Sequence, residues 1–313
     1  MSDATPSRAA SGAWPALPLA SWADTHATLH LWLQIVGKVR LALSPPQNHC
    51  WNATLYVTAS GLTTSSIPHP AGAFMIDFDF RMQRLVIRTE EGTDGGFALA
   101  PMSVASFHAR TMDELARVGR PVRINPRPNE VAEPIPFAQD EVHHAYDAER
   151  AARFWRILVE VDRVLKVFRA RFIGKSSPVH LFWGAPDLAA TRFSGRRAPR
   201  HPGGIPGLPD EVTRDAYSHE VSSAGFWAGT GPVGDPAFYA YAYPEPPGFA
   251  SARVPAPAYY HAELREFVLP YDAVRTAADP DATLLAFLEA TYVAAADGSG
   301  WDRASLERRH DAE

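Results

Sequence analysis

The sequence predicts an α+β protein made of two related halves, each a mostly antiparallel sheet with flanking helices. Three observations lead to this prediction. Apolar residues recur at helical spacing across 147–172, apolar and polar residues alternate from Phe74 to Phe80, and one order of landmarks occurs twice along the chain. Such a duplication predicts a pseudo-twofold axis, with the two sheets either joined or face to face.

The repeated landmarks can be followed residue by residue. In each half a helix is followed by Gly-Lys, Ser-Pro, a histidine, a tryptophan, several strands, a Phe-x-Leu element and a proline before a capped helix. The landmarks of the first half are Gly37-Lys38, Ser44-Pro45, His49, Trp51, Phe97-x-Leu99, Pro101 and Ser103. Those of the second are Gly174-Lys175, Ser177-Pro178, His180, Trp183, Phe267-x-Leu269, Pro270 and Asp272. The alternative is that two unrelated helix–sheet–helix segments share this order.

Composition divides the chain into five segments. We expect a disordered N-terminus at 1–12, a first half at 13–120, a proline-rich linker at 121–145, a second half at 146–300 and a charged tail at 301–313. The first helix is expected to begin near Ser21 or Asp24, either of which can cap it. A second long helix should span about 147–172, and a third region of helix should end near Ala295.

Charge and composition exclude several classes of protein. The formal net charge is −5 and the pI is about 6.2. The chain therefore lacks the excess of positive charge that is typical of nucleic-acid-binding proteins. A single cysteine, Cys50, allows no intramolecular disulfide and no Cys-based zinc site, and it fits a reducing compartment. The start has no signal-peptide pattern, and no apolar run reaches eighteen residues. We therefore expect a cytoplasmic protein with no membrane or nucleic-acid partner; the oligomeric state stays open.

The first helix carries the clearest local pattern. His26, His30, Gln34 and Lys38 recur every four residues on a helix that is otherwise almost wholly apolar. This stripe is either the solvent face of the helix or the lining of a cavity. His26 and His30 match a helical metal pair, but no glutamate follows His26 as in zinc proteases.

Two segments of the second half hold further candidates. In 217–227 the adjacent His219 and Glu220 point to opposite faces of a strand, so only one can enter a given pocket. In 180–196, Asp187 and Arg192 are charges in apolar surroundings and need partners, either each other or a bound ligand. Arg192 is suited to a carboxylate or phosphate. Each histidine has the alternative of a purely structural, hydrogen-bonded role.

These residues form one hypothetical site. His180, His219 and Glu220 are the candidate catalytic residues, and His180 and His219 are expected to lie close together. The candidate substrate-binding residues are His30, Gln34, Lys38, His49, Asp187 and Arg192. The cleft between two duplicated lobes is where both sets could meet. P-loop and nucleophile-elbow motifs are absent from the chain.

Several longer motifs resemble one bacterial family. They lie at 28–41, 48–49, 55–58, 61–64, 77–80, 177–184 (SPVHLFWG), 191–196, 217–227 (YSHEVSSAGFW) and 269–274. Together they identify the chain, from about Trp14 to Leu306, as similar to the family catalogued as domain of unknown function 5996. That family carries an aromatic residue after its Asn-His pair, where this chain has Cys50, which argues against Cys50 as a catalyst. The resemblance implies membership and no particular reaction.

The sequence therefore favours an enzyme without specifying its reaction. We expect a small substrate, which can be anionic, bound between the two halves by histidine, glutamate, arginine and lysine residues. Two alternatives stay open: a small-molecule-binding protein without catalysis, and a metalloenzyme with a histidine/carboxylate centre holding a transition metal.

Overall fold

The computed structural model describes residues 13–205, 207–230 and 233–308. The predicted disorder of 1–12 and the end of the predicted tail therefore lie outside the described residues. The helices are α1 (Ala23–Leu43), α2 (Val104–Arg117), α3 (Ala148–Ala170), α4 (Asp210–Ala216), α5 (Tyr271–Arg275), α6 (Pro280–Gly298) and α7 (Arg303–Leu306). Short 3-10 turns lie at η1 (Leu19–Ser21), η2 (Asn48–Cys50), η3 (Phe137–Gln139) and η4 (Phe249–Ser251).

The strands form two antiparallel sheets. The first sheet contains β1 (Tyr56–Val57), β2 (Gly61–Thr63), β3 (Phe74–Asp79), β4 (Arg84–Thr89) and β5 (Gly95–Ala98), in chain order. The second contains β6 (His180–Phe182), β7 (Asp187–Arg197), β8 (His219–Trp227), β9 (Ala237–Tyr243), β10 (Tyr259–His261) and β11 (Glu266–Pro270). Its spatial order is β10-β11-β9-β8-β7-β6. The predicted α+β class is confirmed.

Local chemistry explains where the long helices begin. The Asp147 side chain accepts a hydrogen bond from the Arg150 amide and caps α3, and Ser103 caps α2 in the same way. Helix α1 differs from the prediction, because Trp22 is its N-cap residue and neither Ser21 nor Asp24 caps it with a side chain. Helix α4 begins directly after Pro209 and carries Asp210 and Glu211 in its first turn.

The two halves repeat the same order of elements. Helix α1 precedes the meander β1 to β5 and helix α2 follows it, while α3 precedes the meander β6-β7-β8-β9-β11 and α5 follows it. Strand β10 is an addition at the outer edge of the second sheet. This repeated order agrees with the predicted duplication.

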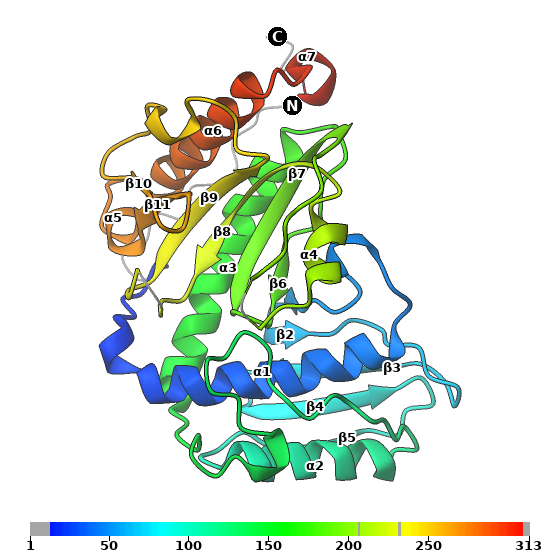
Figure 1. The fold of residues 1–313 in the computed structure, drawn as a ribbon. Coiled ribbons are helices and arrows are strands. Elements are labelled where there is room, and N and C mark those ends of the chain that lie inside the picture. The colour runs from blue at the N-terminus through cyan, green and yellow to red at the C-terminus, as the bar shows by residue number, and fades with distance from the viewer. Residues whose placement is uncertain (1–12, 206, 231–232, 309–313) are drawn as a thin grey trace, which may run out of the picture.

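The two sheets are joined at their first strands. Leu55 and Leu181 form an isolated antiparallel bridge with reciprocal backbone hydrogen bonds of 2.9 and 2.8 Å. Helix α3 runs past both sheets, and α1 crosses where they meet (Figure 1). Trp183 donates its indole N–H to the Ala53 carbonyl at 2.8 Å, which adds a second link across the junction.

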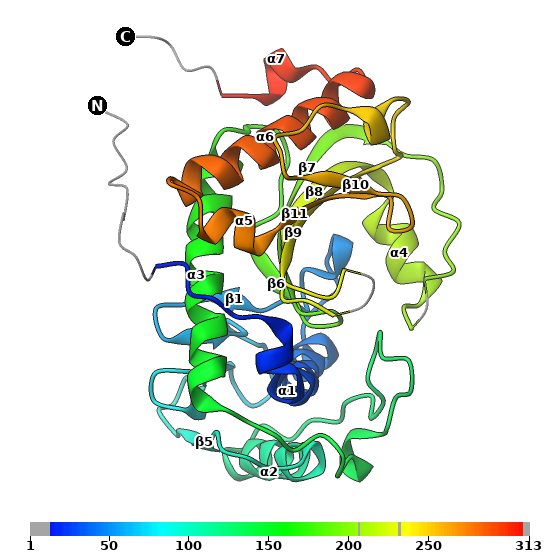
Figure 2. The same ribbon diagram turned by 90° about the vertical axis from the view of Figure 1, so that its left-hand side faces the viewer.

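The two faces of the second sheet have different neighbours. One face is apolar and packs under α3, α5 and α6, through residues such as Leu188, Phe226 and Phe238. The other, which we call the inner face, is polar and lies on the side of α4 (Figure 2). The inner face is defined by Asp187, Thr191, Ser223, Tyr239, Tyr241 and Glu266. The alternation of side chains along a strand separates the two sets.

Candidate functional site

The polar stripe of α1 is buried and faces protein. Gln34 is fully buried and Lys38 is 4% exposed. The His30 Nε2–H donates to the Gly184 carbonyl at 2.6 Å, and burial lowers the pKa of this imidazole to about 4. Lys38 donates to the Asn129 side chain and lies over the Trp183 ring at 5.4 Å. The stripe is therefore not a solvent face. Three of its members, His30, Gln34 and Lys38, pair with backbone and side chains, whereas Nε2 of buried His26 has no hydrogen-bond partner among the described residues.

Gln34 holds the proline-rich segment in place. Its side-chain NH2 group donates to the Asn129 backbone carbonyl at 2.8 Å, and its side-chain oxygen accepts from the Asn129 backbone N–H at 2.8 Å. One side chain thus makes the pair of hydrogen bonds that a neighbouring strand would make. The next residue, Glu130, has a left-handed φ of 54°. A Cβ added at Gly184 would lie 1.8 Å from the Glu130 carboxylate, so only glycine allows this approach. The stripe thus positions Glu130 beside the second sheet.

Replacing Gln34 by Leu is expected to lower the free energy of unfolding by about 2–4 kcal/mol, because two buried backbone groups of Asn129 lose their partners. Urea unfolding would measure the loss, and limited proteolysis should cut within 122–146 more readily. The exposed Gln139→Leu is the control and should change neither. Equal behaviour of the two variants would show that Gln34 does not anchor this segment.

The inner face is organised around Asp187 and Tyr239. The Tyr239 hydroxyl donates to the Asp187 carboxyl. The two residues come from β7 and β9, which are separated by β8, so the tyrosine ring must cross that strand. It does so over Gly225, where an added Cβ would lie 2.7 Å from the Tyr239 hydroxyl oxygen. Glycine at 225 therefore makes the Asp187–Tyr239 hydrogen bond possible.

A second group of hydroxyls continues along the inner face. Tyr217 donates to the Tyr241 hydroxyl at 2.9 Å, and the Thr191 and Ser223 hydroxyls are 2.9 Å apart. The Tyr239 and Tyr241 rings stack with centroids 6.2 Å apart. Burial raises the pKa of Tyr217 to about 12 and holds those of Tyr239 and Tyr241 well above their usual value. All three tyrosines are therefore neutral hydrogen-bond donors at physiological pH.

Three carboxyl groups share this face without a cation. The pKa of Asp187 is raised to about 8, first by burial and also by the nearby charges of Glu130 and Glu266, while the Tyr239 hydrogen bond opposes this rise. Burial raises the pKa of Glu266 to about 7 and also raises that of Glu130. No ion pair to these three residues occurs in the described part of the chain. Asp187 and Glu266 nevertheless keep partial access to solvent.

His49 and His180 lie at the β6 side of the same face. The His49 ring stacks on Trp51 at 5.3 Å and on Phe182 at 5.9 Å, and the His180 ring meets Phe182 at 4.5 Å. His180 Nδ1 donates to the Pro178 carbonyl at 2.8 Å, so its Nε2 is a bare acceptor, and burial lowers its pKa to about 3. Neither His180 Nε2 nor His49 Nδ1 has a hydrogen-bond partner among the described residues. His49 and His180 therefore lie close to each other, around the ring of Phe182.

The backbone next to His49 is unusual. His49 and Cys50 have φ values of 59° and 53°, a left-handed conformation that is uncommon outside glycine. Burial raises the pKa of the Cys50 thiol. Because the thiolate is the nucleophile, this environment does not activate Cys50.

The expected contact between His180 and His219 is wrong. His180 pairs with Ala189 on β7 and His219 pairs with Arg197, eight residues further along the same strand. At the usual rise of a strand this separates them by roughly 25 Å. Glu220 also lies at this far end, where its carboxylate binds Ser194 at 2.8 Å and Arg196 at 2.7 Å.

Arg192 is buried as predicted, but its partners differ from those expected. It lies on the helix-covered face, while Asp187 lies on the inner face, because the two positions differ by an odd number along one strand. Its guanidinium stacks on Phe168 at 3.5 Å and its nearest carboxylate, on Glu289, is 3.8 Å away. The alternative of an Asp187–Arg192 pair is therefore wrong.

The sequence missed several residues of the inner face. Tyr239 and Tyr241 lie on β9, and the alternation of tyrosine with alanine along this strand was the available signal. No sequence pattern indicated that Glu130 and Glu266 belong to this face. Glu266 reaches it through long-range strand pairing, and Glu130 is held beside it by the stripe of α1. Among the described residues no group of three or more His, Cys, Asp or Glu side chains is arranged to hold a metal ion.

Comparison with known proteins gives one match. A family model described as a family of unknown function, DUF5996, matches residues 14–308. No curated protein and no solved structure matches the chain. Within the described ranges, no helix is long and apolar enough to cross a membrane.

Proposed function

Because the chain belongs to the DUF5996 family of unknown function, its activity must be argued from the site, and we propose that it is an enzyme of acid–base chemistry. Its substrate would be a small molecule with a carbonyl or similar acceptor oxygen, bound on the inner face of the second sheet. The sequence-based expectation of an anionic substrate rested on Lys38 and Arg192. Neither lies on the inner face, and the groups there are neutral or acidic.

The Asp187–Tyr239 pair carries this proposal. With a pKa of about 8, Asp187 is a neutral carboxylic acid at pH 7. One of its oxygens accepts the Tyr239 hydroxyl, and its own proton remains available to a substrate oxygen. A neutral acid and a tyrosine that donate together can stabilise negative charge as it develops on a carbonyl oxygen.

Glu266 is suited to the role of general base. Its pKa of about 7 lets it exchange a proton near neutral pH, where a base is most effective. It would take a proton from the carbon next to the carbonyl, the electron pair would move toward the oxygen held by Asp187, and the same proton would return to another position. The substrate is isomerised, and no further reactant is needed.

We expect the activity to have a narrow pH optimum between about 7 and 8. It should rise as Glu266 loses its proton near pH 7 and fall as Asp187 loses its proton near pH 8. The measurement is exchange of solvent deuterium into a panel of small carbonyl compounds, followed by mass spectrometry. Asp187→Asn and Tyr239→Phe should lower the rate about 100-fold or more. The exposed Tyr259→Phe should not change it.

Binding of 4-nitrophenol at pH 6 tests the site without a known substrate. Its phenolate imitates the charged intermediate, and below pH 7 Glu266 is protonated, as it would be after taking a proton. Binding that weakens in Tyr239→Phe, together with exchange on the panel, supports the proposal. Binding without exchange of any compound would indicate a small-molecule-binding protein instead. Equal binding by wild type and Tyr239→Phe would remove Asp187 and Tyr239 from any site.

A further inference from the structure

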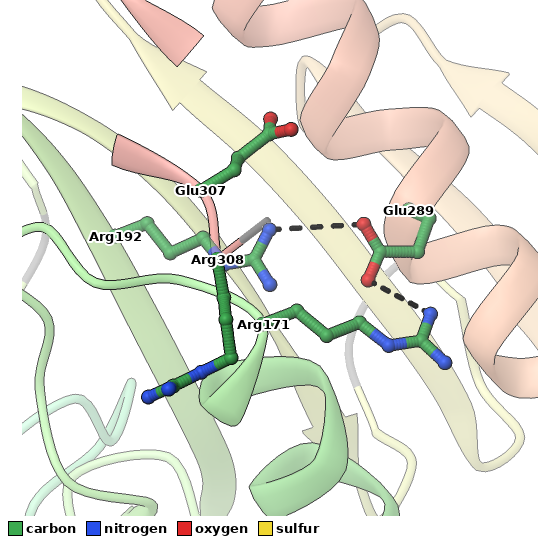
Figure 3. A pocket seen from close by; sticks show the side chains of 5 residues that line it. All are labelled: Arg171, Arg192, Glu289, Glu307 and Arg308. Carbon is green, nitrogen blue, oxygen red and sulfur yellow. Dashed lines mark hydrogen bonds and ion pairs between the residues drawn. The ribbon is translucent and has the colours of Figure 1, made fainter. Parts of the chain in front are cut away.

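A pocket lies on the opposite side of the second sheet from the inner face. Its volume is about 410 Å³, and its lining residues come from the end of α3, from β7, from α6 and from the end of α7. They are Arg171, Arg192, Glu289, Glu307 and Arg308. The guanidinium groups of Arg171 and Arg192 turn toward Glu289 (Figure 3).

Arg192 is the buried member of this group. It is 2% exposed and lies between the rings of Phe168, at 3.5 Å, and Tyr292, at 4.2 Å. One of its terminal nitrogens donates to the Phe168 carbonyl, while its Nε has no hydrogen-bond partner among the described residues. A buried guanidinium with a missing partner is costly, and an oxygen acceptor would relieve that cost.

The carboxylates of the pocket do not balance its arginines. Glu289 is shared between Arg171, at 3.3 Å, and Arg192, at 3.8 Å, and only the first distance is a hydrogen bond. Glu307 already binds Arg303, outside the lining set, at 2.6 Å. Arg308 uses its Nε for the Ala170 carbonyl at 3.1 Å. Three arginines and two carboxylates therefore line the pocket, and one of the carboxylates is engaged elsewhere.

We infer that this pocket binds a small oxyanion, with Arg192 at its buried end and Arg171 and Arg308 at its more exposed side. A guanidinium presents parallel N–H groups that match two oxygens of one phosphate or carboxylate. Chloride lacks that geometry. The site lies on the opposite face of the sheet from Asp187. The inference therefore does not depend on the proposed acid–base chemistry.

Isothermal titration of the dialysed full-length chain with inorganic phosphate tests this inference. Wild type is expected to bind phosphate, and chloride at matched ionic strength should give no signal. Arg171→Gln and Arg308→Gln should each weaken binding by about tenfold, since each removes charge-assisted hydrogen bonds. Both side chains are more exposed than that of Arg192, so both variants should fold. Arg127→Gln, an exposed arginine elsewhere, is the matched control.

An acetate titration identifies the preferred oxyanion. Acetate binding that also weakens in Arg171→Gln and Arg308→Gln would support the site and assign it to a carboxylate. Absence of binding by both phosphate and acetate would overturn the inference. Affinities that are equal in wild type, Arg171→Gln and Arg308→Gln would overturn it as well.

Discussion

Replacing Asp187 by Asn is expected to flatten the dependence of stability on pH and to make the protein more stable than wild type at pH 9. The folded-state pKa of this carboxyl is raised to about 8, whereas in an unfolded chain it is about 3.9. Between these values the folded protein holds one proton more than the unfolded chain. The stability that this proton contributes is fully present below about pH 4 and is lost as the pH rises through about 8.

The expected size of this effect is large. The full shift would correspond to about 6 kcal/mol, and partial access of Asp187 to solvent reduces this to about 3–5 kcal/mol. Urea unfolding of both proteins at pH 4.5, 6, 7.5 and 9 would measure it. In Asp187→Asn the free energy of unfolding should still fall slightly as the pH rises, because the pKa of Glu266 is also raised. Asp113→Asn, at an exposed position of α2, is the control. If the free energy of unfolding of Asp187→Asn varied with pH in parallel with that of wild type, Asp187 would not be neutral in the folded state.

The second large effect is expected at Arg192. Replacing it by Ala should lower the free energy of unfolding by about 3–5 kcal/mol, because it empties the space between two aromatic rings and removes a buried hydrogen bond to the Phe168 carbonyl. The sequence suggested a different cause of destabilisation, namely that Asp187 would remain as a buried carboxylate without a partner. Glu289 keeps Arg171 as a partner and is not left alone.

Arg192→Met separates the two contributions of this side chain. Methionine keeps much of the buried volume and removes the charge, and buried ionic groups are often replaced by apolar ones at little cost. We therefore expect Arg192→Met to unfold at a higher urea concentration than Arg192→Ala. The reverse order would mean that charge, and not packing, dominates at this position. Arg127→Ala is the surface control for both.

Some errors at the site were avoidable from the sequence. Asp187 and Arg192 are five positions apart on one strand, so the alternation of side chains already places them on opposite faces. Others were not avoidable. Whether His180 lies near His219 depends on the register among β6, β7 and β8, and a strand that shifts by two residues keeps its faces but changes every neighbour.

The sequence by itself determined the α+β class, the two long helices, the repeated order of elements and the apolar surroundings of the α1 stripe. These follow from periodicity and capping, which act over a few residues. Only the tertiary structure decided that Gln34 holds the backbone of Asn129 and Lys38 its side chain, and that Tyr239 crosses Gly225 to reach Asp187. Only it brought Glu130 and Glu266 to the same face. Those contacts join residues up to about a hundred positions apart, so they depend on sheet register and chain crossing, which no local pattern encodes.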